Sequence, residues 1–112
     1  MTAPAHPSGS GSLPALGGEA GPVLVIADHA AVAWRGLAWA TDFAARGRLH
    51  RVRLVGPTPS DVESIVAEAV GLGATALLVA GGETARHAGQ AVAARLGLPL
   101  AIETDAPPPS GR

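Results

Sequence analysis

The sequence of 112 residues contains no cysteine and no lysine, and its formal net charge is only −1. The absence of cysteine excludes disulfide bonds, thiolate catalysis and cysteine-based metal sites. A nearly neutral chain also lacks the strong electrostatic field that general binding to nucleic acid or to a membrane surface requires. We therefore expect neither nucleic acid nor a membrane among the partners of this protein.

Long apolar runs are missing as well. No segment approaches the length of apolar sequence that spans a bilayer. The first residues lack the positively charged start and the apolar core of a signal peptide. The sequence therefore predicts a soluble, cytoplasmic protein.

Both ends of the sequence are poor in large apolar residues. Residues 1–21 are mostly Pro, Ala, Gly and Ser, and residues 106–112 include three consecutive prolines. Such segments bury too little apolar surface to offset the entropy lost on ordering. We expect a disordered leader at 1–21, one ordered domain at 22–105 and a disordered tail at 106–112. A domain of this size buries only about 60–65 % of its unfolded surface, so burial against a partner would help its stability.

Four short apolar runs alternate with three segments of helical period, which predicts parallel strands joined by crossover helices. Three runs are continuous, as expected for strands covered on both faces, whereas residues 51–55 alternate Arg with apolar residues like an edge strand. Right-handed crossovers then give an α/β three-layer sandwich around a four-stranded parallel sheet of Rossmann-like or flavodoxin-like type, in strand order 2-1-3-4. The predicted strands are residues 23–27, 51–55, 76–80 and 100–103.

The second and third helical segments carry boundary signals. Ser60 followed by Glu63 is a capping box that starts the second helix, and Gly71 or Gly73 can end it. The third helix should stop at Gly97, just before a proline. The residues predicted to face the core are Val62, Ile65, Val66, Ala69 and Val70 in the second helix, and Ala85, Ala88, Val92 and Leu96 in the third.

The first helix, roughly residues 30–45, has very little polar surface. A helix of this kind usually has two neighbours, and one of them can be another copy of the chain. Two readings stay open: Trp34 and Trp39 cap a small core, or the helix forms a homodimer through Trp34, Trp39 or Phe43. The two apolar stripes are Trp34, Leu37, Ala38 and Thr41, and Val32, Trp39 and Phe43; the polar strip is Arg35, Asp42 and Arg46.

A parallel sheet of this topology places its ligand crevice at the carboxyl ends of the strands. Several polar or glycine residues follow the predicted strands and should meet at that edge. Arg86 and His87 lie in the first turn of the third helix, next to the same edge. The residues after the strands are Asp28, His29, Gly56, Pro57, Thr58, Gly81, Gly82, Glu83, Thr84, Glu103, Thr104 and Asp105.

The diglycine at 81–82 follows a predicted strand and opens a predicted helix, where glycine lets a ligand approach backbone amides and the helix dipole attracts an anion. Arg86 could add a charge-assisted contact to a phosphate. Glu83 stabilises the helix start but would repel a phosphate unless a cation mediates. The turn is thus either a ligand site or a structural corner. The candidate binding residues are Gly81, Gly82, Glu83, Thr84, Arg86 and Asp28.

The sequence signals for a metal site or for acid–base catalysis are weaker. His87 with Asp28, His29 or Glu103 could build a metal site or an acid–base pair, but no metal-ligand spacing is present. We therefore predict no metal site and assign no catalytic residue. The basic stretch at 46–53 has no interleaved aromatic residue, which favours a solvated helix end and edge strand over a surface for RNA or an acidic partner.

The segment LLVAGGETARHAGQAVAARLGLPLAIETDAP resembles the cofactor-binding region of the dehydroquinate synthase and glycerol dehydrogenase superfamily. That region has a strand, a Gly-Gly-Gly turn, a helix bearing Asp and Lys, and a Gly-x-Pro strand entry. Aligning on Gly97 and Pro99 places Gly81 and Gly82 on the first two glycines, and it places Glu83, His87 and Gln90 on the third glycine, the Asp and the Lys. The resemblance implies a Rossmann-like half-domain for NAD(P). The family's helical domain, which carries its metal ligands, has no counterpart in these 112 residues.

The same turn is similar, more distantly, to the amino-terminal lobe of diacylglycerol kinase-like and NAD kinase-like enzymes. Their Gly-Gly-Asp-Gly-Thr signature is approximated by Gly81, Gly82, Glu83 and Thr84, without its later glycine. This resemblance implies a nucleoside phosphate as the ligand. The family's β-rich second lobe also has no counterpart.

Three functional hypotheses follow from the sequence. The first is a stand-alone Rossmann-like domain that binds a nucleotide or a phosphorylated small molecule at the Gly81–Arg86 turn, without complete catalytic machinery. The second is a structural or interaction module that dimerises through its first helix. The third is half of an NAD-dependent dehydrogenase or synthase, or of a lipid-kinase-like enzyme, completed by a partner subunit.

Overall fold

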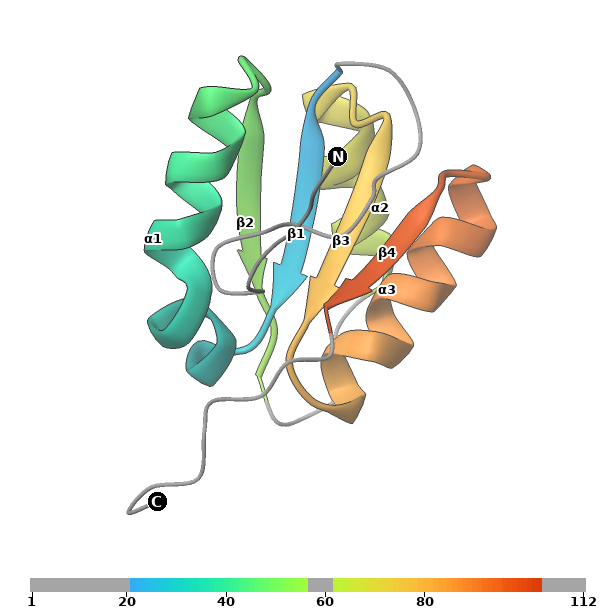
Figure 1. The fold of residues 1–112 in the computed structure, drawn as a ribbon. Coiled ribbons are helices and arrows are strands. Elements are labelled where there is room, and N and C mark those ends of the chain that lie inside the picture. The colour runs from blue at the N-terminus through green and yellow to red at the C-terminus, as the bar shows by residue number, and fades with distance from the viewer. Residues whose placement is uncertain (1–20, 57–61, 104–112) are drawn as a thin grey trace, which may run out of the picture.

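The computed structural model describes residues 21–56 and 62–103, and these form an α/β fold with a four-stranded, all-parallel sheet (Figure 1). The strand order is β2-β1-β3-β4, so the predicted fold class and order are confirmed. The predicted tail, and the leader apart from Gly21, lie outside the described residues. The elements are β1 (Val23–Ala27), α1 (His29–Ala45), β2 (His50–Leu54), α2 (Val62–Leu72), β3 (Ala76–Ala80), α3 (Glu83–Leu96) and β4 (Leu100–Glu103).

The helices divide between the two faces of the sheet. α1 lies on one face, and α2 and α3 lie on the other (Figure 1). Every residue of β1 and β3 is buried, because these central strands have neighbours on both sides and cover on both faces. This arrangement explains their continuous apolar sequences. The α1 side of the core contains Val23, Val25, Ala27, Trp39, Phe43, Ala76, Leu78 and Ala80; the other side contains Leu24, Ile26, Ile65, Ala69, Leu77, Val79, Ala85, Ala88 and Val92.

α3 packs closely against β3 through its small residues. A Cβ added to Gly89 would overlap the side chain of Val79, so the helix can lie this near only with glycine at that position. Ala85, Ala88 and Val92 are buried as predicted, while Leu96 is partly exposed. The helix ends at Gly97, whose φ of 66° lies in the left-handed region that glycine adopts readily.

α2 follows its predicted pattern except at one end. Ile65 and Ala69 are buried, but Val70 is 62 % exposed, so the prediction that Val70 faces the core is wrong. Val70 is one residue, or about 100° of helical rotation, past the inward-facing Ala69. Gly73, with a φ of 75°, follows the helix and ends it as expected. Ser60 of the predicted capping box lies outside the described residues.

The predicted polar strip of α1 is wrong at Arg35. Arg35 is only 8 % exposed and belongs to the inward side of the helix, together with Trp39 and Phe43, which are fully buried. Trp39 and Phe43 are therefore core residues and are not available for a dimer interface. Trp34 and Leu37 instead face solvent, with 44 % and 83 % of their surfaces exposed.

Most arginines of the basic stretch at 46–53 contact other residues of the domain. Arg48 donates to the carbonyl oxygen of Gly21 at 2.6 Å, and Arg53 donates to Glu68 at 2.9 Å. Arg51 lies 3.9 Å from the same carboxylate. The contacts of Arg51 and Arg53 join the edge strand β2 to α2, and the contact of Arg48 joins the segment before β2 to the segment before β1. In the part of the chain that the structure describes, no helix combines the length and apolar character needed to cross a membrane.

We expect His50 to make the stability of the fold sensitive to pH. Its ring stacks on Phe43 with the centroids 4.9 Å apart, and burial lowers its pKa from the ordinary 6.5. The unfolded chain therefore binds a proton more readily than the folded chain just below pH 6.5. We expect the free energy of unfolding to fall as the pH drops from 6.5 through the lowered pKa of folded His50.

Thermal unfolding of the wild type and of His50→Phe between about pH 7 and about pH 5 measures this contribution. The wild type should lose more stability than the variant over that range, because carboxylates titrate equally in both proteins. Equal losses would show that His50 does not cause the dependence.

Candidate functional site

The candidate site lies at the carboxyl edge of the sheet, where the strand order reverses. The chain leaves β1 toward β2 on one side and leaves β3 toward β4 on the other, so the switch point lies between β1 and β3 (Figure 1). Open α/β sheets bind ligands at this position. Asp28 follows β1 and the diglycine follows β3, and the structure brings these residues into direct contact.

The Asp28 carboxylate links the starts of two helices. Its Oδ1 atom accepts a hydrogen bond from the Ala31 amide at 2.8 Å, which caps α1. Its Oδ2 atom accepts one from the Gly82 amide at 2.9 Å, at the start of α3. Amides at helix N-termini stabilise an anion. A negative charge is therefore held in a defined orientation at the switch point.

The two glycines of the turn have different roles. Gly81 has a φ of 125°, and a Cβ on it would lie 2.6 Å from the Cγ and Oδ2 atoms of Asp28. Glycine at 81 therefore lets the carboxylate reach the next amide. A Cβ on Gly82 would lie 3.7 Å from the same Oδ2 atom, which is an ordinary contact. The turn thus has a definite structural role at Gly81, whether or not it also binds a ligand.

α3 begins without a capping side chain. Its N-cap residue is Gly82, no side-chain hydrogen bond caps the helix, and its first backbone bond runs from the Arg86 amide to the Gly82 carbonyl. The amides of Glu83 and Ala85 precede that bond and have no carbonyl acceptor within the helix. Glu83 adds a negative charge to the first turn, where it stabilises the helix dipole.

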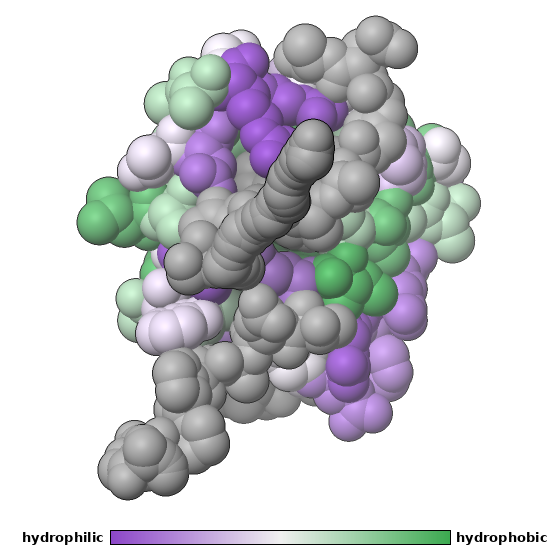
Figure 2. Space-filling view, viewed as in Figure 1, coloured by the Kyte–Doolittle hydropathy of each residue, from purple (hydrophilic) through white to green (hydrophobic). Residues whose placement is uncertain are grey.

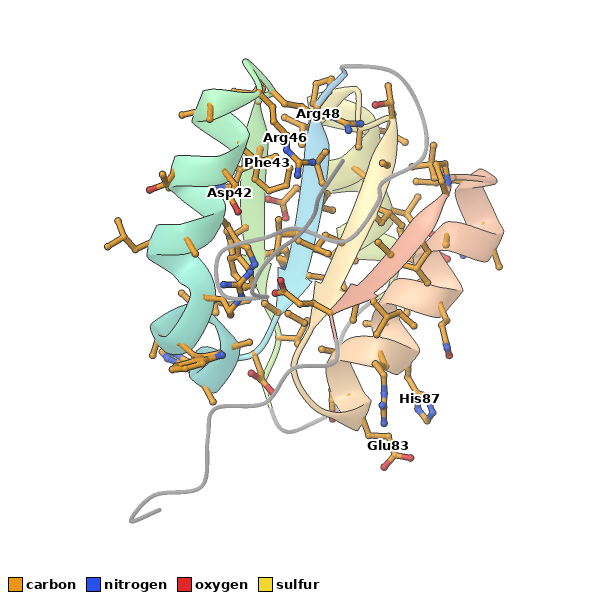
Figure 3. The ribbon with its side chains drawn as sticks, viewed as in Figure 1. Asp42, Phe43, Arg46, Arg48, Glu83 and His87 are labelled. Atoms are coloured by element: carbon orange, nitrogen blue, oxygen red, sulfur yellow. The ribbon has the colours of Figure 1, made fainter. Side chains whose placement is uncertain are left out.

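A shallow groove of about 420 Å³ runs beside this helix start. Its polar side consists of four α3 residues spaced i, i+3, i+4 and i+7, which share one face of the helix. Figure 3 shows two of them, Glu83 and His87, projecting outward from the start of α3. The groove therefore presents a cation, a carboxylate, an imidazole and an amide beside one apolar side chain. It is lined by Glu83, Arg86, His87, Gln90 and Ile102.

The Glu103 side chain does not line this groove, although Glu103 ends β4 at the same edge of the sheet. Its side chain lies on the α1 face of the sheet, where Oε2 accepts from Arg35 Nη2 at 2.7 Å and Oε1 accepts from Trp39 Nε1 at 2.9 Å. His87 belongs to α3 on the opposite face, so the two residues do not form an acid–base pair. Across residues 21–56 and 62–103, no group of three or more His, Asp or Glu side chains could hold a metal ion.

The sequence reading missed the cluster of Arg35, Trp39 and Glu103. A signal was present, because Arg35 lies one helical turn before Trp39 in an otherwise apolar helix. The remaining edge residues of the prediction, Pro57, Thr58, Thr104 and Asp105, lie outside the described residues.

A scan against protein-family models and a search of curated proteins gave no match for this sequence. The resemblances to the dehydroquinate synthase and glycerol dehydrogenase superfamily and to diacylglycerol kinase-like enzymes stay predictions from motifs.

Proposed function

We propose that this domain binds a nucleotide or a related phosphorylated small molecule at the Gly81–Arg86 turn, without complete catalytic machinery of its own. The observation that carries the proposal is an uncapped helix start at the switch point of the sheet, opening into a groove that contains Arg86. The volume of about 420 Å³ falls within the range of about 300–1,000 Å³ for small-molecule sites.

The phosphate group has two sources of stabilisation in this proposal. The amides of Glu83 and Ala85 and the positive end of the α3 dipole attract an anion. The guanidinium of Arg86, one turn into the helix, can donate charge-assisted hydrogen bonds to phosphate oxygens. The Gly82 amide is already bonded to Asp28, so the phosphate is expected nearer Arg86 than the diglycine.

The two carboxylates at this edge select the kind of phosphate ligand. Asp28 is held by backbone amides as an oriented acceptor, which suits the hydroxyl groups of a ribose or another sugar. Asp28 and the exposed Glu83 would repel a bare phosphate, and a Mg²⁺ ion carried by the ligand's phosphates would offset this repulsion. A sugar phosphate or a nucleotide taken up with Mg²⁺ fits this combination.

Removal of the Arg86 side chain tests the proposal. We expect Arg86→Ala to weaken binding by about tenfold to about a hundredfold, because it removes a hydrogen bond to a charged group worth about 1.5–3 kcal/mol. Isothermal titration with Mg²⁺ and ATP, NAD, NADP or a sugar phosphate measures the effect.

The matched control is Arg95→Ala, which removes the same charge from the last turn of the same helix, where Arg95 pairs with the exposed Glu63. Its affinity should equal that of the wild type. Absence of binding by the wild type to every compound, or an equal loss in both variants, would contradict the proposal.

A further inference from the structure

The two faces of the sheet are covered unevenly. α2 and α3 pack on one face, whereas α1 is the only described helix on the other, where its closest strand is the edge strand β2 (Figure 1). β3 and β4 therefore have no described helix over them on the α1 face. Figure 2, which views this face, shows hydrophobic surface where Figure 1 places β4. The side chains of this half-face are Ala76, Leu78 and Ala80 of β3 and Ala101 and Glu103 of β4.

This half-face is buried all the same within one chain. Leu78 is fully buried, and Ala80 and Glu103 are 3 % and 7 % exposed. Arg35 and Trp39 reach from α1 to the Glu103 carboxylate, and they too have only 8 % and 0 % of their surfaces exposed. These values hold for a single chain, so no second copy is needed to explain them. Another segment of the same chain therefore has to lie over the half-face.

We propose that the amino-terminal segment, residues 1–20, crosses the half-face and covers it with Leu13 and Leu16. These two leucines are the only large apolar residues between residues 2 and 20. Alone, the segment buries too little surface to become ordered, which is why its composition predicts a disordered leader. An apolar half-face beside its attachment point supplies the missing burial.

The place where this segment joins the domain brings both leucines within reach. Gly21 lies at the amino edge of the sheet, next to the entry of β3, because a Cβ on Gly21 would lie 2.5 Å from the Cγ2 atom of Thr75. At about 3.3 Å per extended residue, Leu16 can lie about 16 Å from Gly21, and Leu13 about 26 Å from it. The five residues of β3 span about 16 Å by the same measure, so the two leucines can reach the full length of the half-face.

The carboxy-terminal tail is a poorer cover for this half-face. Residues 104–112 contain three consecutive prolines and no leucine, isoleucine, valine, methionine or aromatic residue. They also continue from Glu103, which ends β4 at the carboxyl edge of the sheet, opposite to Gly21. The groove beside α3 lies on the other face of the sheet, so the proposed cover leaves it accessible.

Quenching of Trp39 fluorescence by acrylamide tests this cover in the full chain. Trp34→Phe removes the only other tryptophan, which is 44 % exposed, from every protein compared. Leu13→Ser with Leu16→Ser should then raise the quenching constant of Trp39 severalfold, because the indole loses its cover. The control is Leu37→Ser, the same change at an 83 % exposed leucine of α1, and it should leave the quenching unchanged. Circular dichroism verifies that each variant is folded.

Cross-linking measures the position of the segment directly and does not depend on the serine variants. The natural chain has no cysteine, so a short bismaleimide should join Leu16→Cys to Ala101→Cys within one chain. The control is Leu100→Cys, one residue earlier in β4, whose side chain packs on the other face of the sheet. It should not link to Leu16→Cys.

Three results would overturn the proposal. Equal quenching of Trp39 with and without the two leucines would show that the segment is not its cover. Protection of Trp39 that rises with protein concentration would assign the cover to a second copy. Linking of Leu16→Cys to Ala101→Cys and to Leu100→Cys equally, or to neither, would place the segment elsewhere.

Discussion

Replacement of Glu103 by alanine should lower the free energy of unfolding by about 3–5 kcal/mol, the range for breaking a buried ion pair by removing one partner. Glu103 is 7 % exposed and Arg35 is 8 % exposed, and their charged atoms lie 2.7 Å apart. The substitution would deprive the buried guanidinium of this carboxylate and Trp39 Nε1 of its acceptor. Domains of this kind have only about 5–15 kcal/mol of stability in total, so the loss is a large share.

Two further variants separate the charge from the hydrogen bond. Glu103→Gln keeps an acceptor for Trp39 but removes the negative charge, so it should cost less than Glu103→Ala. The double variant Arg35→Met with Glu103→Leu removes both charges and should recover the part of the stability lost to the unpaired guanidinium, because apolar residues of similar volume can replace a buried pair, while Trp39 Nε1 still loses its Glu103 acceptor. Urea unfolding at one pH measures all three. A double variant as unstable as Glu103→Ala would contradict this account.

The second large effect is expected at Gly81. Gly81→Ala should cost about 2.5–6 kcal/mol, the sum of backbone strain at a φ of 125° and loss of a charge-assisted hydrogen bond. The new Cβ would occupy the space of the Asp28 carboxylate, which would then leave the Gly82 amide. α1 would also lose its N-cap contact to Ala31, which Asp28 makes from the same position.

The adjacent glycine supplies the control. At Gly82 the φ is −83° and a Cβ has room, so Gly82→Ala should cost only about 1 kcal/mol, as expected for alanine at an N-cap. Unfolding of the two variants under the same conditions compares them directly. If both glycines tolerate alanine equally, the contact between Asp28 and the turn does not constrain the fold as described.

Most of the fold could be predicted because the relevant signals are local. The continuous apolar runs at 23–27 and 76–80 indicated strands covered on both faces, and these became the central β1 and β3. The alternating arginines at 51–55 indicated an edge, and β2 is an edge strand that begins one residue earlier, at His50. The strand order 2-1-3-4 is the order expected of a doubly wound sheet with right-handed crossovers.

The contacts that could not be predicted join residues far apart in the sequence. Helical periodicity predicts that a charged residue faces solvent, and it therefore places Arg35 in the polar strip of α1. Its carboxylate partner is 68 residues away and comes into reach only when the sheet places β4 two strands from β1. The hydrogen bond from Gly82 to Asp28 likewise depends on the backbone angles of Gly81, which no pattern of residues specifies.

The most direct measurement of the proposed function is an NMR titration of the backbone amides of the whole chain with ATP and Mg²⁺, and in parallel with NAD, NADP and a sugar phosphate. We expect at least one compound to shift the amide signals of residues 82–87 and of the α1 start at Ala31 in a saturable way. The signals of Leu37 and its neighbours on the exposed face of α1 should stay unchanged. The absence of saturable shifts at residues 82–87 with all four compounds would contradict the proposed function.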